Sequence, residues 1–507
     1  MNNKASIFLP LACLAGLSGS ASAQIAQRPN ILWVMAEDMG QDLECYGMKA
    51  VRTPILNKLA SEGVKYNAAT CTSPISSPNR SAMMTGVHQT VTNAHNHRSN
   101  RDLPLDKRFK PITYYLRQQG YTCILGHSKV WSKGRKTDCN FKHDPIGTWD
   151  GVKNFGLFDK YDEFTPEDQP FFAQVQLQIT HRGDWWKSIT EKSAHPIDPA
   201  DVELPPYLPN DMQIRKQFAS YLDQVEYMDA EMGLLLDDLK AKGMLDNTII
   251  FFIGDNGRCE IKGKGYLYEP GLKIPMIAWG KGIKRSEVDG IVSTLDISAT
   301  VLDLAGVKIP STFMGKPLFD KHTGKAIDGT ADYVYSARDN WDEVIECIRS
   351  VSSSQYKYIR NYMPQQGWDM HQQYLDFHRP AIHILRTLKE EGKLNHDQLL
   401  FMAKNKPVEE LYDIASDPYE LHNLAHDPAH KATLEAMRSR LKEWQQKHKD
   451  IGLTDRLHRT PEDMGNVRDY VKKNLPTDWQ RLQSGEICDS YKAFRIKANK
   501  AKKAKNN

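Results

Sequence analysis

The chain has 507 residues, a formal net charge of +4 at pH 7, 40% hydrophobic residues and 26% charged residues. This composition is typical of a folded globular protein, and the length predicts one large domain with a smaller one. The small positive charge weakly favours anionic ligands and gives no support for nucleic acid, which we do not expect as a partner.

The first 23 residues have the pattern of a secretion signal. Lys4 supplies a positive start, residues 7–17 are largely apolar, and Ala21-Ser22-Ala23 is a cleavage signal. The apolar run is too short and too interrupted to cross a membrane, and we expect no transmembrane segment elsewhere. We therefore expect a secreted, periplasmic protein. Lipoprotein anchoring at Cys13 is the alternative, although Pro10 stands where a lipobox normally has Leu.

The eight cysteines are scattered along the chain. Seven remain once Cys13 is removed with the signal, and none forms a Cys-x-x-Cys pair. This pattern favours neither a zinc site nor a dense disulfide framework. The odd number leaves at least one free thiol, and one bridge stays possible.

The chain after the signal alternates apolar strands with amphipathic helices. A long helix is predicted from the apolar face that runs from Phe218 to Leu239. The other elements expected here are strands at 31–36, 121–125, 171–179, 248–253 and 274–279 and helices at 54–62 and 111–119. This alternation predicts an α/β sandwich with a large, mostly parallel central sheet in a domain of residues 24–340.

The pattern changes near residue 340. A strand at 356–360 and an amphipathic helix at 429–449 predict a smaller α+β domain with a short antiparallel sheet, over residues 341–490. Residues 491–507 form a Lys-rich tail, which we expect to be a solvated terminus rather than a binding arm.

A motif in residues 76–86, Ser-Ser-Pro-Asn-Arg-Ser-Ala-Met-Met-Thr-Gly, is the strongest functional signal. It resembles the signature of type I sulfatases, in which Cys or Ser is followed by x-Pro-x-Arg and, five residues after the Arg, by Thr-Gly. In that family the first residue is oxidised to formylglycine (3-oxoalanine). The resemblance implies that Ser76 is modified, with Pro78 and Arg80 as determinants for an anaerobic sulfatase-maturating enzyme. Cys71 lacks Pro and Arg at these spacings.

The chemistry explains why such a residue is needed. A hydrated aldehyde carries two hydroxyls on one carbon. One attacks the sulfur of a sulfate ester, and the other then loses its proton and expels sulfate, which regenerates the aldehyde. A plain serine would be trapped as its sulfate ester.

Acidic and amide side chains follow two of the predicted strands. Glu37 and Asp38 come directly after the first strand, and Asp255 and Asn256 follow another. Strand ends in a parallel sheet collect ligands, and these oxygens suit a hard cation such as Ca²⁺ or Mg²⁺. The family holds calcium with an Asp-Asp pair and an Asp-Asn or Asp-His pair. By resemblance, these residues and the modified Ser76 form the metal site, with Glu37 as a longer replacement for the first Asp.

Further family positions are matched by basic residues. Lys264 begins a segment similar to the family's Lys-x-x-x-Tyr-Glu, whose Lys contacts the sulfate. His181 follows a strand where the family places a His on the bridging oxygen, and it is expected to be the general acid. The family usually has Gly-Lys-x-His where this chain has Gly126-His127-Ser128-Lys129. His127 and Lys129 are thus exchanged, and which one holds the nucleophile and which takes its second proton stays open.

The resemblance extends over nearly the whole mature chain, and it implies an alkaline-phosphatase-like fold and a sulfatase of carbohydrates. Sulfated glycosaminoglycan or mucin-type sugars are the expected substrates. The residues expected to form the sugar subsite are His95, His97, Arg98, Arg338, Asp339, Asn340 and Trp341. Two alternatives remain: a phosphodiesterase or phosphonate hydrolase of the same superfamily, and a non-catalytic sulfoglycan-binding protein in which Ser76 stays unmodified.

Overall fold

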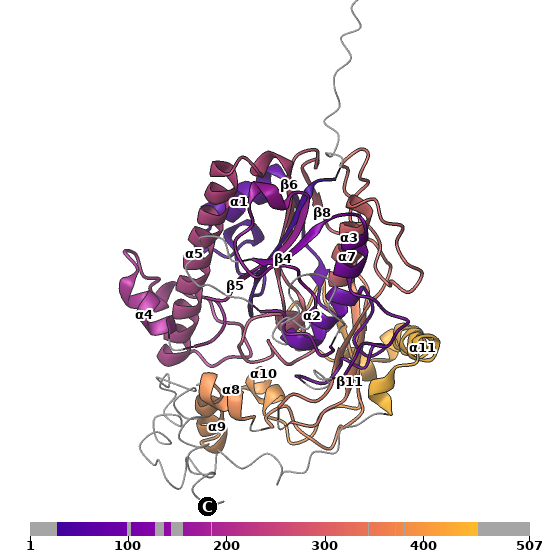
Figure 1. Ribbon diagram of the computed structural model, residues 1–507. Helices are drawn as coiled ribbons and strands as arrows, with labels where there is room; N and C mark the ends of the chain where they lie inside the picture. Colours follow the sequence, from indigo (N-terminus) through magenta and orange to yellow (C-terminus); the bar gives the residue numbers. More distant parts are fainter. Residues whose placement is uncertain are drawn as a thin grey trace, which may run out of the picture.

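A computed structural model describes residues 28–98, 103–126, 136–142, 156–183, 185–342, 344–370, 372–379 and 381–454 (Figure 1). The predicted signal peptide, Cys13, His127, Lys129 and the basic tail lie outside the described residues.

Within the described part of the chain, a seven-stranded sheet forms the centre of the molecule. Its strands, in spatial order, are β4 (Thr122–Gly126), β5 (Phe171–Leu177), β1 (Asn30–Ala36), β6 (Thr248–Gly254), β7 (Met276–Trp279), β2 (Val64–Tyr66) and β8 (Ser286–Val288). The first four run parallel, and β7 is antiparallel to both β6 and β2. The predicted α/β class with a mostly parallel sheet is therefore confirmed.

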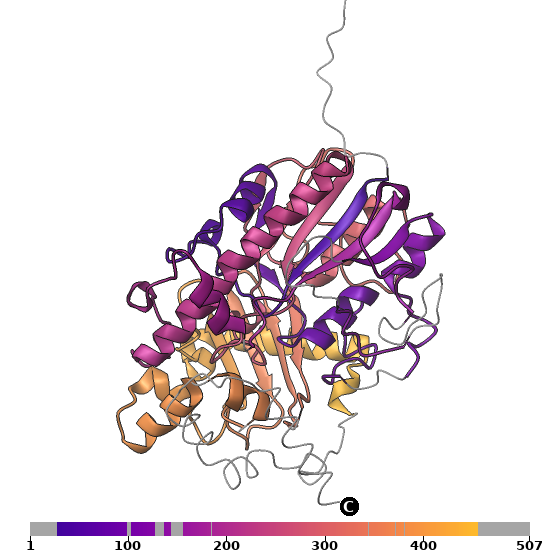
Figure 2. The same ribbon diagram turned by 60° about the vertical axis from the view of Figure 1, so that its left-hand side comes forward.

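Helices cover both faces of this sheet because its central strands are apolar on both sides. On β1, Leu32 and Val34 pack with one set of helices, whereas Ile31 and Trp33 pack with the other. The first face carries α1 (Pro54–Glu62), α4 (Trp185–Lys192) and the long α5 (Met212–Ala241). The second face carries α2 (Ser76–Thr85), α3 (Ile112–Gln118) and α7 (Thr294–Leu304). Figure 2 shows α5 lying along its face of the sheet.

A four-stranded antiparallel sheet follows in the chain and lies beside one end of the large sheet (Figures 1 and 2). Its strands are β10 (Val334–Arg338), β11 (Ile348–Ser352), β12 (Tyr356–Asn361) and β13 (Glu409–Asp413). Helix α11 (Lys431–His448) packs on it through Leu434, Met437 and Leu441. The remaining elements are α6 (Glu269–Leu272), α8 (Gln373–His378), α9 (Ala381–Glu390), α10 (His396–Phe401), and the short pair β3 (Ala69–Thr70) and β9 (Val292–Ser293). The small antiparallel sheet is as predicted, and the exact division at residue 340 stays a prediction.

Two predicted boundaries differ from the observed ones for local reasons. The strand expected at 171–179 ends at Leu177, because the chain turns there and His181 N donates to Gln178 O. The helix expected at 429–449 begins at Lys431, since residues 428–430 form a 3-10 turn capped by Asp427.

The described residues bear on the predictions about disulfide bonds and about transmembrane segments. No disulfide bond is formed by the six cysteines there, namely Cys45, Cys71, Cys123, Cys139, Cys259 and Cys347. Among the helices of the described ranges, none combines the length and apolar character that crossing a membrane requires.

A buried ion-pair network joins the small sheet to the chain that follows α11. The guanidinium of Arg349, on β11, donates to Asp450 at 2.6 and 2.9 Å and to Asp339 at 3.0 Å. All three side chains are almost fully buried. Removing the arginine would leave two carboxylates without a counter-charge in a low-dielectric interior.

We predict that Arg349→Met lowers the free energy of unfolding by about 3–5 kcal/mol, the cost of breaking a buried pair. Arg438→Met is the matched control. It removes an exposed pair with Glu409, and exposed pairs contribute less than about 1 kcal/mol. Urea denaturation of both variants is the measurement. Equal losses of stability would contradict a structural role for the buried network.

Candidate active site

The adjacent ends of β1 and β6 bring two predicted pairs of polar residues together. These strands are parallel neighbours with Ala36 opposite Gly254. Directly beyond this point, Asp38 N donates to Asp255 Oδ1 at 3.0 Å, and Asn256 Nδ2 donates to Asp38 Oδ1 at 3.1 Å. All three side chains are completely buried. The arrangement therefore concentrates negative charge at the end of the sheet.

Ser76 faces this cluster from the first residue of α2. Its Oγ donates to Asn256 Oδ1 at 2.9 Å, and the residue is buried. The start of α2 is fixed by Asn79, whose Nδ2 donates to the backbone oxygen of Asp255 at 2.8 Å. The same side chain accepts a hydrogen bond from Thr72 N at 3.1 Å. The helix thus holds residue 76 against the oxygen cluster.

Three cations neutralise the buried carboxylates. Lys264 Nζ lies 2.6 and 2.8 Å from the two oxygens of Asp38, and Arg80 Nε lies 3.0 Å from Asp255 Oδ2. Lys136 Nζ lies 2.8 Å from Glu37 Oε2.

The charges of these groups depend on one another. Burial alone would raise the pKa of Glu37, but nearby Lys136, His181 and Arg80 lower it to about 2. Burial opposes the charged form of Lys264, yet the Asp38 carboxylate holds its pKa above the ordinary value. The site therefore consists of ionised groups of both signs at neutral pH.

His181 lies beside the two acidic residues at the end of β1. Its Nε2 is 3.8 Å from Glu37 Oε2 and 3.7 Å from Asp38 Oδ2. Its Nδ1 is 3.1 Å from the backbone oxygen of Arg182. Because a carbonyl oxygen only accepts, Nδ1 carries the proton in this contact and Nε2 presents a lone pair. Burial lowers the pKa of His181, so the ring is largely neutral at pH 7.

Two residues at this site were not predicted from the sequence. Lys136 lies in a basic stretch without a recognisable motif. Tyr374 comes from α8, and its hydroxyl lies 3.4 Å from His181 Nε2. The Tyr374 ring also lies 5.3 Å from Lys264 Nζ. Only the tertiary fold brings these two residues to the cluster, so no spacing in the sequence signals them.

Trp341, one of the predicted sugar-subsite residues, lies beside this group. Its ring is 5.9 Å from Lys264 Nζ and 5.9 Å from the ring of Tyr374. Gly265 has a φ of +93°, and a Cβ there would lie 2.2 Å from Trp341. The glycine therefore allows the tryptophan to pack directly over the backbone next to Lys264.

Two more predicted sugar-subsite residues lie near Trp341 or next to residue 76. His97 N donates to Asn340 O at 2.9 Å, and its ring lies 6.2 Å from that of Trp341. Arg98 N donates to Ser77 Oγ at 3.1 Å, next to residue 76, while its side chain is exposed.

The remaining predicted sugar-subsite residues contact other side chains of the protein. Asp339 is paired with Arg349, and the Arg338 guanidinium stacks over Tyr266 at 5.1 Å. His95 is buried, with its Nε2 3.2 Å from Asn96 Nδ2. These three residues contact other parts of the protein, whereas Trp341 lies near Lys264, His97 lies near Trp341, and Arg98 lies next to residue 76.

The predicted metal ligands are together, but their carboxylates are engaged with cationic side chains. In the part of the chain that the structure describes, no group of three or more His, Cys, Asp and Glu side chains is arranged as a metal site. The predicted set also uses the Asn256 amide and residue 76, and all its donors are oxygens. This donor chemistry fits a hard cation, provided that Lys264, Lys136 and Arg80 share the carboxylates with it.

Comparisons with known proteins point in one direction. A family model described as Sulfatase matches residues 29–307, and a model described as N-sulphoglucosamine sulphohydrolase, C-terminal, matches residues 257–379. An ulvan-active sulfatase of Formosa agariphila is 31% identical, over 83% of this chain and 75% of the relative. The N-sulphoglucosamine sulphohydrolase of Homo sapiens is 26% identical, over 83% of this chain and 90% of the relative.

The solved structure of a 2-O GAG sulfatase superposes with a TM-score of 0.60 at 21% identity, covering 86% of this chain and 96% of the other. This likeness concerns the fold. The family model, in contrast, spans both strand ends, the Ser76 motif and Lys264. The chain therefore belongs to the sulfatase family and is a sulfuric ester hydrolase with an alkaline-phosphatase-like fold.

Proposed function

We propose that this sulfatase removes sulfate from sulfated carbohydrates, using a formylglycine formed from Ser76 and a calcium ion held beside it. The observation that carries the proposal is the contact of 2.9 Å between Ser76 Oγ and Asn256 Oδ1, among buried and oppositely charged side chains. The relatives named for activity on ulvan and N-sulphoglucosamine support a carbohydrate substrate. An anaerobic sulfatase-maturating enzyme would be the partner that modifies residue 76, and a secreted, periplasmic location suits a polymer-degrading enzyme.

Residue 76 is well placed for the modification to be useful. The hydrated aldehyde supplies a nucleophile that releases sulfate without being consumed. Asn256 Oδ1 accepts a hydrogen bond from the hydroxyl at this position. The N-terminus of α2 adds a favourable field for negative charge at residue 76. The chain thus orients residue 76 toward the sulfur of a bound sulfate ester.

A calcium ion would be held by Glu37, Asp38, Asp255, Asn256 and residue 76. Its chemistry there is to polarise the sulfate and favour the ionised nucleophile. The four side chains follow the adjacent ends of β1 and β6 and are almost fully buried. Their oxygens are the ligand type that calcium prefers, and magnesium is the alternative.

The basic residues have separate tasks in this proposal. Lys264 binds a sulfate oxygen, because its ammonium remains charged beside Asp38. His181 first accepts a proton at Nε2 from the solvent and then donates it to the leaving sugar oxygen, which returns the imidazole to its neutral form. Tyr374 orients the imidazole through its contact with Nε2. Arg80 fixes Asp255, and Lys136 fixes Glu37.

The remaining assignments concern the sugar and the second proton. The exposed Arg98, with His97 and Trp341, would contact the sugar beside the sulfate. These sugar-contacting residues would be held in place by His95, Arg338, Asp339 and Asn340. His127 and Lys129, which lie outside the described residues, are proposed to share the holding and deprotonation of the nucleophile.

The first prediction concerns the nature of the nucleophile. Protein coexpressed with an anaerobic maturation enzyme should carry formylglycine at position 76, measured by peptide mass spectrometry. It should desulfate one member of a panel of N-sulfated and 2-, 3-, 4- and 6-O-sulfated sugars. Ser76→Ala should lower kcat/KM more than about 1000-fold. Full modification with turnover of phosphate diesters, but of no sulfate ester, would overturn the proposal.

A second prediction concerns the metal. Treatment with EDTA should abolish turnover, and added Ca²⁺ should restore it. Ca²⁺ should also raise the Tm of the EDTA-treated protein, because a ligand that binds only the folded state stabilises it. Asp38→Asn should remove the Tm response. Full turnover after removal of all divalent ions would refute the calcium assignment.

A third prediction concerns Lys136. Lys136→Met removes the ammonium that contacts Glu37 and should lower kcat/KM about 10–100-fold, as for other residues that orient metal ligands. It should also weaken the Ca²⁺-dependent rise in Tm. Lys142→Met, at an exposed lysine six positions later, should leave both properties unchanged. If the two variants behave alike, Lys136 has no part in the site.

A further inference from the structure

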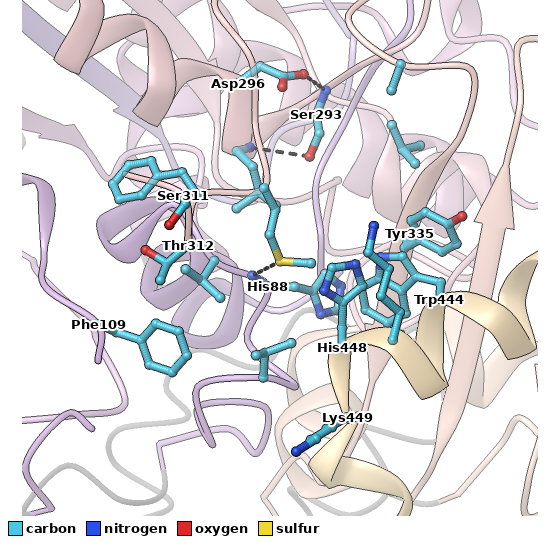
Figure 3. Close-up of a pocket in the computed structure, with 18 of the residues that line it drawn as sticks. His88, Phe109, Ser293, Asp296, Ser311, Thr312, Tyr335, Trp444, His448 and Lys449 are labelled. Carbon is cyan, nitrogen blue, oxygen red and sulfur yellow. Dashed lines mark hydrogen bonds between the residues drawn. The ribbon is translucent and has the colours of Figure 1, made fainter. Parts of the chain in front are cut away.

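A hollow of about 700 Å³ is lined by the residues drawn in Figure 3. It is bounded by the chain after α2 at Val87 and His88, by residues 311–314, by β10 and by the end of α11. Of the predicted catalytic, metal and sugar-subsite residues that the structure describes, none lines it. It is large enough for an oligosaccharide segment, since ligand pockets typically measure about 300–1,000 Å³.

One side of the hollow is aromatic. Tyr335 on β10 and Trp444 on α11 are stacked, with ring centroids 4.6 Å apart and an interplanar angle of 14°. His88 meets Trp444 edge-on at 4.8 Å. Phe109 lies on the opposite side in Figure 3, near Thr312. Trp444, His88 and Phe109 are buried, and Tyr335 is partly exposed. The rings therefore form an apolar wall with a few polar edges, which suits the mixed surface of a sugar.

The charged side chains that line the hollow are mainly basic. Arg108, Lys447 and Lys449 are exposed there. The acidic Asp296 is buried, and its oxygens accept hydrogen bonds from Ser293 N at 2.7 Å, Lys316 N at 2.8 Å and Thr330 Oγ1 at 2.5 Å. Its oxygens are therefore occupied by hydrogen bonds within the protein, and the exposed basic side chains favour an anionic ligand in the hollow.

We propose that this hollow is a second, non-catalytic binding site for a sulfated oligosaccharide segment. The aromatic wall would contact the sugar rings, and Lys447 and Lys449 would contact sulfate groups. Arg108, which is paired with the exposed Asp106, would assist them. The identification of the ligand as part of a substrate polymer rests on the proposed function. Ser76 and the hollow lie at opposite ends of α2, about 15 Å of helix apart. A long glycan held here would remain near the catalytic site between successive reactions.

The test uses the full chain as Ser76→Ala, so that binding is measured without turnover. Isothermal titration calorimetry measures the Kd for a heparin octasaccharide and the Kd for its desulfated counterpart, and the two values are compared. Adding Lys447→Gln and Lys449→Gln should weaken binding of the sulfated form about fivefold, from the loss of two exposed ion pairs. Ser311→Trp, which fills the hollow without changing charge, should weaken it similarly.

The matched control adds Lys58→Gln and Lys240→Gln, two lysines that line a separate hollow beside Trp279. This control has the same net charge as the variant with Lys447→Gln and Lys449→Gln. It should bind the sulfated octasaccharide as tightly as Ser76→Ala alone. An equal loss in the control, or no loss in either test variant, would overturn the second site.

A kinetic comparison separates this inference from the proposed function. In the modified enzyme, Lys447→Gln with Lys449→Gln should leave kcat/KM for a sulfated monosaccharide unchanged and raise KM for the polymer. Equal effects on both substrates would overturn the inference while leaving the sulfatase mechanism intact. Conversely, the modified enzyme could desulfate no sugar while the octasaccharide still binds in a way that depends on Lys447 and Lys449. That result would overturn the proposed function but not the second binding site.

Discussion

The architecture of this sulfatase depends on the neutralisation of carboxylates buried at the end of its central sheet. Asp38 and Asp255 are completely buried, which would be very costly for unpaired charges. Lys264 and Arg80 contact them directly, and Lys136 contacts the neighbouring Glu37. Because each charge stabilises the others, the site is held rigidly before a substrate arrives. Such preorganisation is what the stabilisation of a charged transition state requires.

The small sheet and the helices near it contribute residues to this site. Trp341 and Tyr374 approach Lys264 from that part of the chain. A buried contact of Lys357 on β12 with Glu269, at 2.5 Å, and with Glu420, at 2.9 Å, links the small sheet to α6. The positions of Trp341 and Tyr374 beside Lys264 therefore depend on ion pairs that lie outside the proposed active site. The same junction between the two sheets forms the basic hollow beside α11.

The sequence predicts most of the central sheet because buried parallel strands are short and uniformly apolar, as in β1 and β6. It also predicts that Asp38 and Asp255 meet, because polar residues after parallel strands share one end of the sheet. Lys136 and Tyr374 are not predictable in this way, since their places depend on the packing of loops and of α8. The burial of Asp339 against Arg349 likewise depends on a long-range contact.

The most direct test of the central claim is a crystal structure of Ser76→Ala with the sulfated sugar that the active enzyme hydrolyses. We predict that the sulfate lies within hydrogen-bonding distance of Lys264 Nζ, with the ester oxygen near His181 Nε2 and a cation between Asp38, Asp255 and Asn256. A sulfate group bound away from Lys264 and position 76, with the sugar well ordered, would contradict this account of the site.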